Sequence, residues 1–94
     1  MKKCYIVVGM TGEYADYSEW NVHVFLTRKA ANAYKAKLIK WAKDNGVWNT
    51  GKRDDQIRFF RNTALYQKKC PLDPEMTIDY TGVDWKVESC GFEQ

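Results

Sequence analysis

The chain has 94 residues, of which 45% are hydrophobic and 29% are charged, and its formal net charge is +3 at pH 7. This composition is ordinary for a soluble globule and excludes a disordered tail or a collagen-like chain. The length predicts a single domain over residues 1–94 with one modest core. No apolar run reaches the roughly 18–20 residues of a membrane helix, so we expect a cytoplasmic protein without a membrane partner.

The positive charge is concentrated in the middle of the chain. Residues 28–69 hold twelve of the fifteen Lys and Arg residues and three acids, a local charge of +9. Residues 1–27 carry −1 and residues 70–94 carry −5. A basic middle between acidic ends is typical of an anion-binding surface. The alternative is a helical middle that solvates itself with lysine while the strands and loops carry the acids.

Two strands are predicted first. Residues 4–8 form an apolar run that Gly9 ends, which indicates a buried strand. Residues 11–18 are polar and contain glycine, as a loop does. Residues 20–26 alternate with period two, which places four apolar residues on one face of a second strand: Trp20, Val22, Val24 and Leu26. We expect the two strands to pair as an antiparallel hairpin.

A helix between Thr27 and Asn45-Gly46 is the clearest signal in the chain. Thr27 can cap its first turn, and the Asn-Gly pair tolerates the left-handed backbone that ends a helix. The apolar stripe consists of Ala30, Tyr34, Leu38 and Trp41. Ile39 falls among lysines on the opposite face, where a lone apolar side chain gains meaning only if neighbours join it.

A second helix is predicted from Asp54 to about Lys69, because acids favour the first turn and the residue before Pro71 avoids helical angles. Ile57, Phe60 and Ala64 share one face of this helix, and Phe59 and Tyr66 fall on nearly the opposite one. Such a helix is either buried on two sides or offers an aromatic patch to a partner.

The last segment predicts a rigid loop over residues 71–74, a short extended piece over residues 76–80, a turn at Thr81-Gly82 and a strand over residues 84–90. The element order is therefore β-β-α-α-β. We expect an α+β fold, with a small antiparallel three-stranded sheet and two helices packed on one face.

Catalytic and metal sites find little support. Residues 9–12 resemble the start of a phosphate loop, but no helix or Gly-Lys-Ser/Thr follows. Cys4, Cys70 and Cys90 are odd in number and widely spaced, so they make no disulfide framework. The three cysteines and His23 could together be zinc ligands, but no two of them have the short spacing of a zinc knuckle. We expect buried or half-buried free thiols, no metal, no cofactor and no enzymatic activity.

Binding is the better-supported class. Cations between residues 28 and 69 alternate with aromatic residues, which suits backbone neutralisation and base stacking on a nucleic acid. No known nucleic-acid motif is present, so this interpretation is not favoured. A phosphorylated small ligand needs the same groups on a smaller footprint. One small domain rarely encloses a full pocket, so we expect the ligand between subunits of a homo-oligomer.

Two motifs resemble those of a family of small phage and prophage proteins. The family has a Thr-Gly-Glu-Tyr-Ser-Asp loop between a strand and a Trp-led second strand, and later an Asp-Pro followed by Asp-Tyr-Thr-Gly. Residues 5–20 match the first block, with Ala15 in place of the usual serine, and the second block runs from Asp73-Pro74 to Asp79-Tyr80-Thr81-Gly82. The lost hydroxyl puts a ligand role at this position in doubt. Together the motifs cover about a third of the chain.

The resemblance implies a phage origin and a role against host defences, exerted by binding in the host cytoplasm. We expect sequestration of a nucleotide-type immune signal. The candidate ligand-binding residues combine the two motifs with two cations of the first helix: Thr11, Glu13, Tyr14, Asp16, Trp20, Asp79, Tyr80, Thr81, Arg28 and Lys35. If the first and last strands are neighbours, the two motifs could meet, and the first-motif residues, Trp20 included, would face residues 79–81. The alternative interpretation of the motifs is structural, as turns held by side-chain caps, with Trp20 and Tyr80 in the core.

Two other functions stay open. A direct inhibitor would dock on a host defence protein through Ile39, Phe59 and Tyr66. A weaker alternative is a nucleic-acid-binding accessory protein, whose affinity would fall steeply with salt.

Overall fold

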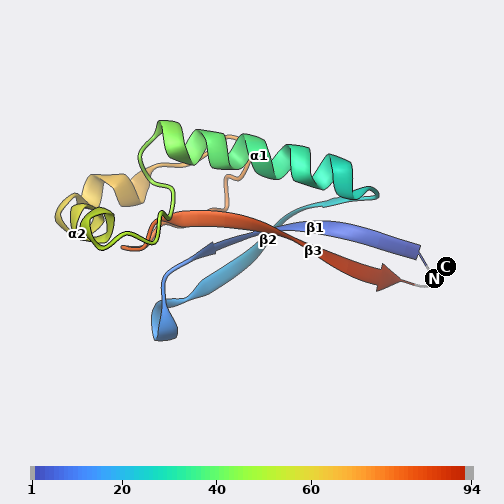
Figure 1. The fold of residues 1–94 in the computed structure, drawn as a ribbon, viewed down its shortest axis with the longest axis horizontal. Coiled ribbons are helices and arrows are strands. Elements are labelled where there is room, and N and C mark those ends of the chain that lie inside the picture. The colour runs from blue at the N-terminus through green and yellow to red at the C-terminus, as the bar shows by residue number, and fades with distance from the viewer. Residues whose placement is uncertain (1, 93–94) are drawn as a thin grey trace.

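The computed structural model describes residues 2–92, and for Lys2, Tyr14, Phe59, Phe60, Thr63 and Phe92 it describes the backbone alone. Strands β1 (Lys2–Thr11), β2 (Ser18–Phe25) and β3 (Val83–Phe92) form an antiparallel sheet in the order β2-β1-β3. Helices α1 (Arg28–Asp44) and α2 (Arg53–Arg61) lie between β2 and β3 in sequence. The expected α+β class and β-β-α-α-β order are confirmed (Figure 1).

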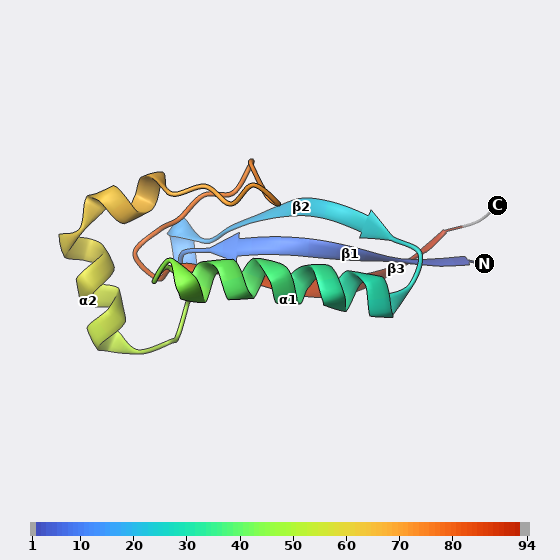
Figure 2. The same cartoon turned by 90° about the horizontal axis from the view of Figure 1, so that it is seen from above.

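Helix α1 runs along one face of the sheet, and α2 lies beyond one end of it (Figure 2). The core forms between α1, the sheet and the segment before β3, with Val7, Leu38, Met76 and Trp85 at most 1% exposed. In the described part of the chain, no helix covers the opposite face of the sheet. Neither α1 nor α2 has the length and hydropathy that a bilayer-spanning helix requires.

Strand β1 continues past Gly9 to Thr11, so the expectation that Gly9 ends it was wrong. Gly9 pairs with Trp20 on one side and with Trp85 on the other. The Trp20 indole lies so close that a Cβ on Gly9 would be 2.3 Å from its Cε2 atom. Glycine therefore serves here to admit a large neighbouring side chain, a role that it can have inside a strand.

The period-two alternation predicted for β2 breaks at a bulge. Val7 pairs with His23 and Val8 with Asn21, which leaves Val22 as the extra residue. An extra residue reverses the faces of everything after it. Phe25 is therefore half-buried and contacts the Tyr34 ring of α1, whereas Val24 and Leu26 are 54% and 77% exposed.

Helix α1 follows the prediction closely. The Thr27 side chain accepts a hydrogen bond from the Ala30 N–H at 3.2 Å, and Asn45 is the C-cap. Ala31, Leu38 and Ala42 are buried against the sheet. Ile39 is half-buried: it packs against the core and also lines a hollow among the lysines of the outer face.

The second helix is shorter than predicted. Helix α2 ends at Arg61, Asn62 has φ −121° and ψ 82°, and a 3-10 helix, η2, covers Thr63–Gln67. Asparagine and β-branched threonine are both poor helix formers, and here they adjoin. The break means that Phe59 and Tyr66 do not belong to one helix, so the expected aromatic face does not exist as predicted.

The segment before β3 is irregular but buried. Met76 and Ile78 are 0% and 7% exposed, although no strand forms over residues 76–80. The Gly82 N–H donates to the Asp79 carbonyl at 2.8 Å, which closes the turn expected at Thr81-Gly82. Gly82 has φ 85°, a value that favours glycine.

Candidate functional site

The two sequence motifs meet at one end of the sheet, because β1 and β3 are antiparallel neighbours. The Thr11 hydroxyl donates to the Gly82 carbonyl at 2.6 Å and accepts from the Asp79 N–H at 2.8 Å. The Thr81 hydroxyl accepts from the Gly12 N–H at 2.8 Å. We call these five residues the motif junction. Both threonines are at most 5% exposed, so their hydroxyls hold the turn together and do not face a ligand.

Three acidic groups surround Tyr80 at the surface of the junction. Its hydroxyl donates to Glu13 Oε2 at 3.4 Å, and the Asp79 carboxylate accepts from the Tyr80 N–H at 2.7 Å. Partial burial raises the pKa of the Tyr80 phenol, and the charges of Glu13, Asp16 and Asp79 raise it further. The ring is therefore held as a neutral phenol next to a negatively charged loop.

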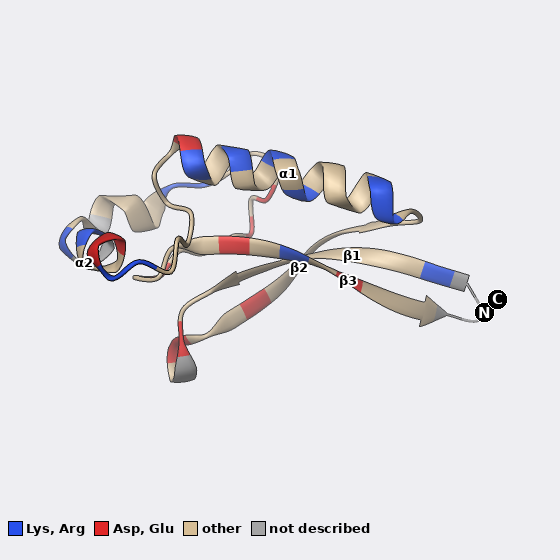
Figure 3. Cartoon of the chain, in the orientation of Figure 1, with Lys and Arg blue, Asp and Glu red and all other residues tan. Residues whose placement is uncertain are grey.

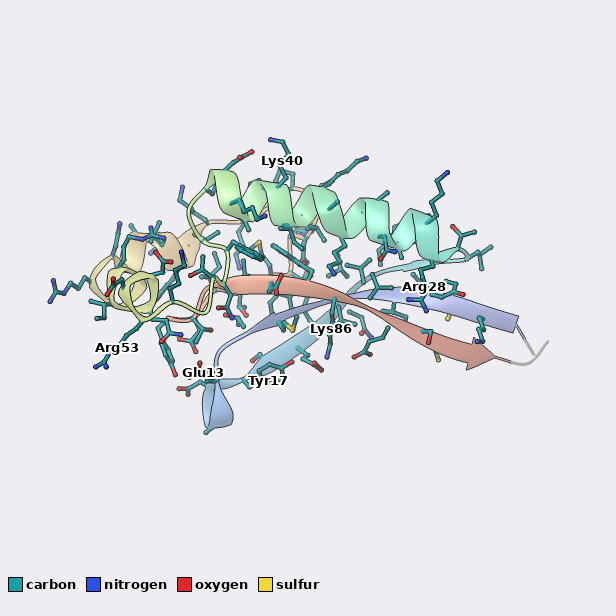
Figure 4. The ribbon with its side chains drawn as sticks, in the orientation of Figure 1. Glu13, Tyr17, Arg28, Lys40, Arg53 and Lys86 are labelled. Atoms are coloured by element: carbon teal, nitrogen blue, oxygen red, sulfur yellow. The ribbon has the colours of Figure 1, made fainter. Side chains whose placement is uncertain are left out.

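A pocket of about 300 Å³ lies between α2 and the Tyr80 ring. Its other lining residues are Arg53, Gln56, Ile57 and Arg61. Their spacing of three or four residues places them on one face of α2, and Figure 4 shows Arg53 and Glu13 on the same side of the molecule. We call this hollow the α2 pocket. Its lining residues include two arginines, a glutamine and a tyrosine.

Of the other predicted ligand-binding residues, Trp20 takes part in the core. Its indole N–H donates to Asp73 Oδ2 at 2.8 Å, and the Trp85 indole donates to the same oxygen at 3.0 Å. Asp73 is 2% exposed, so one buried carboxylate ties two strands to the irregular segment. The expectation that Trp20 faces residues 79–81 was wrong. The Tyr14 side chain lies outside the described residues.

The two cations predicted for the ligand site lie elsewhere. Arg28 stacks over the Tyr5 ring, 4.9 Å from its centroid, at the end of α1 farthest from Glu13 (Figure 4). Lys35 lines a shallow hollow of about 560 Å³ on α1, with Ile39, Lys40 and Lys43 among its neighbours. The prediction that Arg28 and Lys35 share a site with the motifs was therefore wrong.

The predicted partner-binding residues are also dispersed. Tyr66 is half-buried and packs against the core. Its burial raises the pKa of its phenol, and the charge of Asp79 raises it further. Ile39 lies in the α1 hollow. The Phe59 side chain lies outside the described residues, so a joint surface of the three is not defined.

Charge is distributed unevenly over the elements. Figure 3 shows most Lys and Arg on α1 and α2, which also carry acids, and further acids on the β1–β2 loop and the sheet. Some cations are already paired: Lys40 with Asp44 at 2.7 Å, and Lys86 with Glu19 and Glu88. In the described part of the chain, no three His, Cys, Asp or Glu side chains come together as a metal site would require.

Sequence reasoning missed Arg53, Gln56, Arg61 and Asp73. The first three recur at helical spacing, so a helical projection around Ile57 would have placed them together. Asp73 belongs to a motif that the resemblance singled out, but nothing local indicates that two distant tryptophans share its carboxylate. No family model, curated protein or solved structure matches the chain, so the site is interpreted from its chemistry.

Proposed function

We propose that the chain is a non-enzymatic binding protein for a phosphorylated small molecule of the nucleotide type, which occupies the α2 pocket. The observation that carries the proposal is the pairing of Arg53 and Arg61 with the Tyr80 ring around one hollow. Guanidinium groups bind phosphate through two parallel hydrogen bonds. Aromatic rings stack on nucleobases with about 1–3 kcal/mol per base.

The surroundings of the pocket support the same ligand class. Glu13 holds the Tyr80 hydroxyl, which orients the ring, and carboxylates beside the ring are acceptors for sugar hydroxyls or base amino groups. The α2 pocket has a volume of about 300 Å³, which is at the lower limit for small-molecule pockets. A ligand larger than a mononucleotide would extend beyond the pocket, so we propose that a second subunit covers it in a homo-oligomer.

The biological role that we propose is the expected one, sequestration of a nucleotide immune signal by a phage protein. A binder that retains its ligand needs no group for cleaving it. The turn at residues 79–82 is held by buried threonine hydroxyls, which keeps Tyr80 in place before the ligand arrives. Preorganisation of this kind increases affinity because less conformational freedom is lost on binding.

Calorimetric titration with AMP and with cyclic di-AMP tests the proposal, with inorganic phosphate and adenosine as partial ligands. We expect at least one nucleotide to bind, Arg61→Gln to weaken it tenfold or more, and Tyr80→Ala to weaken it more than Tyr80→Phe. Lys29→Gln removes the same charge from an exposed position on α1 and should leave affinity unchanged. Failure of both nucleotides, or equal losses in Arg61→Gln and Lys29→Gln, would contradict the proposal.

A direct protein inhibitor is the second candidate, favoured by the hollow on α1. Ile39 lies there among Lys35, Lys40 and Lys43, with Asp44 paired to Lys40. An apolar centre with a mainly basic rim suits an acidic partner surface. Native mass spectrometry after gentle purification separates the two candidates. A retained nucleotide mass favours ligand binding, whereas a bare chain that binds one host polypeptide and loses it in Ile39→Glu favours inhibition.

A further inference from the structure

Cys4 and Cys90 lie side by side on the face of the sheet opposite α1. Cys4 of β1 and Cys90 of β3 are direct partners in the antiparallel register. The Cys4 thiol donates to the Cys90 carbonyl at 3.4 Å. Cys90 is exposed, Cys4 is half-buried, and Cys70 is enclosed in the core. The expectation that all three are buried or half-buried was therefore wrong for Cys90.

Residues paired in this register lie within the Cα distance that a disulfide can bridge. Directly opposed residues of an antiparallel pair have Cα atoms about 4.5–5.5 Å apart, and disulfides join Cα atoms about 4.4–6.8 Å apart. Both side chains project from the same face, because partners in register do so. Burial raises the pKa of the Cys4 thiol, and the adjacent Cys90 thiol raises it further.

We propose that Cys4 and Cys90 form a cross-strand dithiol that a low-molecular-weight disulfide oxidises to an intramolecular bond. The exposed Cys90 thiolate attacks one sulfur of the small disulfide, forms a mixed disulfide and releases the first small thiolate. Cys4 then gives up its proton and attacks the Cys90 sulfur, which expels the second. Two electrons pass to the small disulfide, and both thiol protons end on its two thiols.

The bond would join the start of β1 to the end of β3. Lys2 pairs with Phe92 and Lys3 with Gly91 there, and the strand ends lie side by side in Figure 1. A cross-link between residues 86 positions apart constrains most of the unfolded chain, which is the condition for a large stabilising effect. The oxidised protein should therefore melt at a higher temperature than the reduced one.

Intact-mass measurement of the folded, full-length chain tests the proposal after treatment with glutathione disulfide. We expect the wild type to lose two hydrogens, a peptide map to show a Cys4–Cys90 link, and Cys70 to stay unmodified. The Cys4→Ser variant should instead keep one glutathionyl group on Cys90. The melting temperature should rise on oxidation of the wild type, return on reduction, and not respond in Cys4→Ser.

The other outcomes overturn the proposal. Two separate glutathionyl groups on the wild type would mean that the thiols react independently, and a bond between two chains would mean that the partner is another copy. Absence of any reaction would mean that the pair is inert. Cys90→Ser, checked by circular dichroism, repeats the test from the other strand, so that a folding failure in one variant does not decide the result.

Discussion

The two ends of the sheet are built differently. At the closed end, residues 9–11, 18–20 and 83–85 of the strands meet the segment of residues 70–82, and Asp73, Thr11 and Thr81 are at most 5% exposed. At the open end, formed by residues 2–6, 23–26 and 88–92, Phe25 packs against Tyr34 of α1, and Leu26 is 77% exposed. The closed end is joined by side-chain hydrogen bonds between segments about 70 residues apart.

This difference shows how buried polar side chains can fix the irregular segments of a small domain that lacks a large core. The two buried threonine hydroxyls at the closed end bond backbone groups that lack secondary-structure partners. The buried Asp73 carboxylate bonds two indole N–H groups. The open end is held by ladder hydrogen bonds and by contacts of the Tyr5 and Phe25 rings with α1 or its first residue. The proposed ligand pocket adjoins the closed end, where positions are fixed, and the proposed dithiol lies at the open end, where a covalent bond would add most.

The largest expected effect is the loss of stability on replacing Asp73, the buried carboxylate at the closed end. Asp73→Ala removes the acceptor of both the Trp20 and the Trp85 indole, and each buried donor left unpaired costs about 1–3 kcal/mol. We expect the free energy of unfolding, measured in urea, to fall by about 3 kcal/mol. Glu75→Ala, at an exposed neighbouring position, should change it by about 0.5 kcal/mol or less. Equal effects would refute the role of Asp73.

The next effect concerns the close approach at Gly9. Gly9→Ala places a methyl group against the Trp20 indole, and overpacking of this kind costs about 1–3 kcal/mol. The same substitution in a Trp20→Leu background should cost clearly less, because the clashing ring is gone. A double-mutant cycle in denaturant measures this coupling. Additive losses would show that Gly9 is needed for a reason other than Trp20.

The open end should tolerate substitution. Leu26→Ser changes an exposed side chain that follows β2, and surface changes of this kind alter stability by about 0.5 kcal/mol or less. Thermal unfolding of this variant beside Asp73→Ala gives the sharpest contrast between the two ends. A loss as large as that of Asp73→Ala would mean that the open end is covered, for example by a second subunit, and would remove the contrast.

The smallest expected effect is a shift in the pKa of Glu19, on the face of the sheet opposite α1. The Lys86 ammonium, and then the Tyr17 hydroxyl, hold the pKa of the Glu19 carboxyl below its ordinary value of 4.5. Its contribution to stability is therefore present above that value and is lost as the pH falls through the folded-state pKa. Lys86→Met should move the Glu19 pKa upward in a carboxyl NMR titration. Lys40→Met, which removes the partner of Asp44, should leave it unchanged.

The elements that could be predicted from sequence are those with local causes. The Thr27 cap and the apolar spacing of α1 are properties of neighbouring residues, and they gave the helix almost residue by residue. The fold class followed from the order of such elements. The motif junction was partly foreseen, since the two motifs were expected to meet if the first and last strands were neighbours.

The rest depended on contacts between distant residues. The bulge at Val22 is set by pairing with β1, so the alternation within β2 alone indicated the wrong face for Val24. The break at Asn62 was visible only as two poor helix formers in a row. The α2 pocket needs Tyr80 to be brought against Arg53 and Arg61, and no local pattern predicts that approach.

The position of β1 at the centre of the sheet also has a consequence for folding. β1 can pair with β2 as soon as a short loop closes, but its other edge waits for β3, whose Cys90 is 86 positions from Cys4. Closing that longer loop costs more chain entropy, and contacts of high sequence separation slow folding. The β1–β2 hairpin and α1 should therefore assemble first, with β3 docking last as the rate-limiting step.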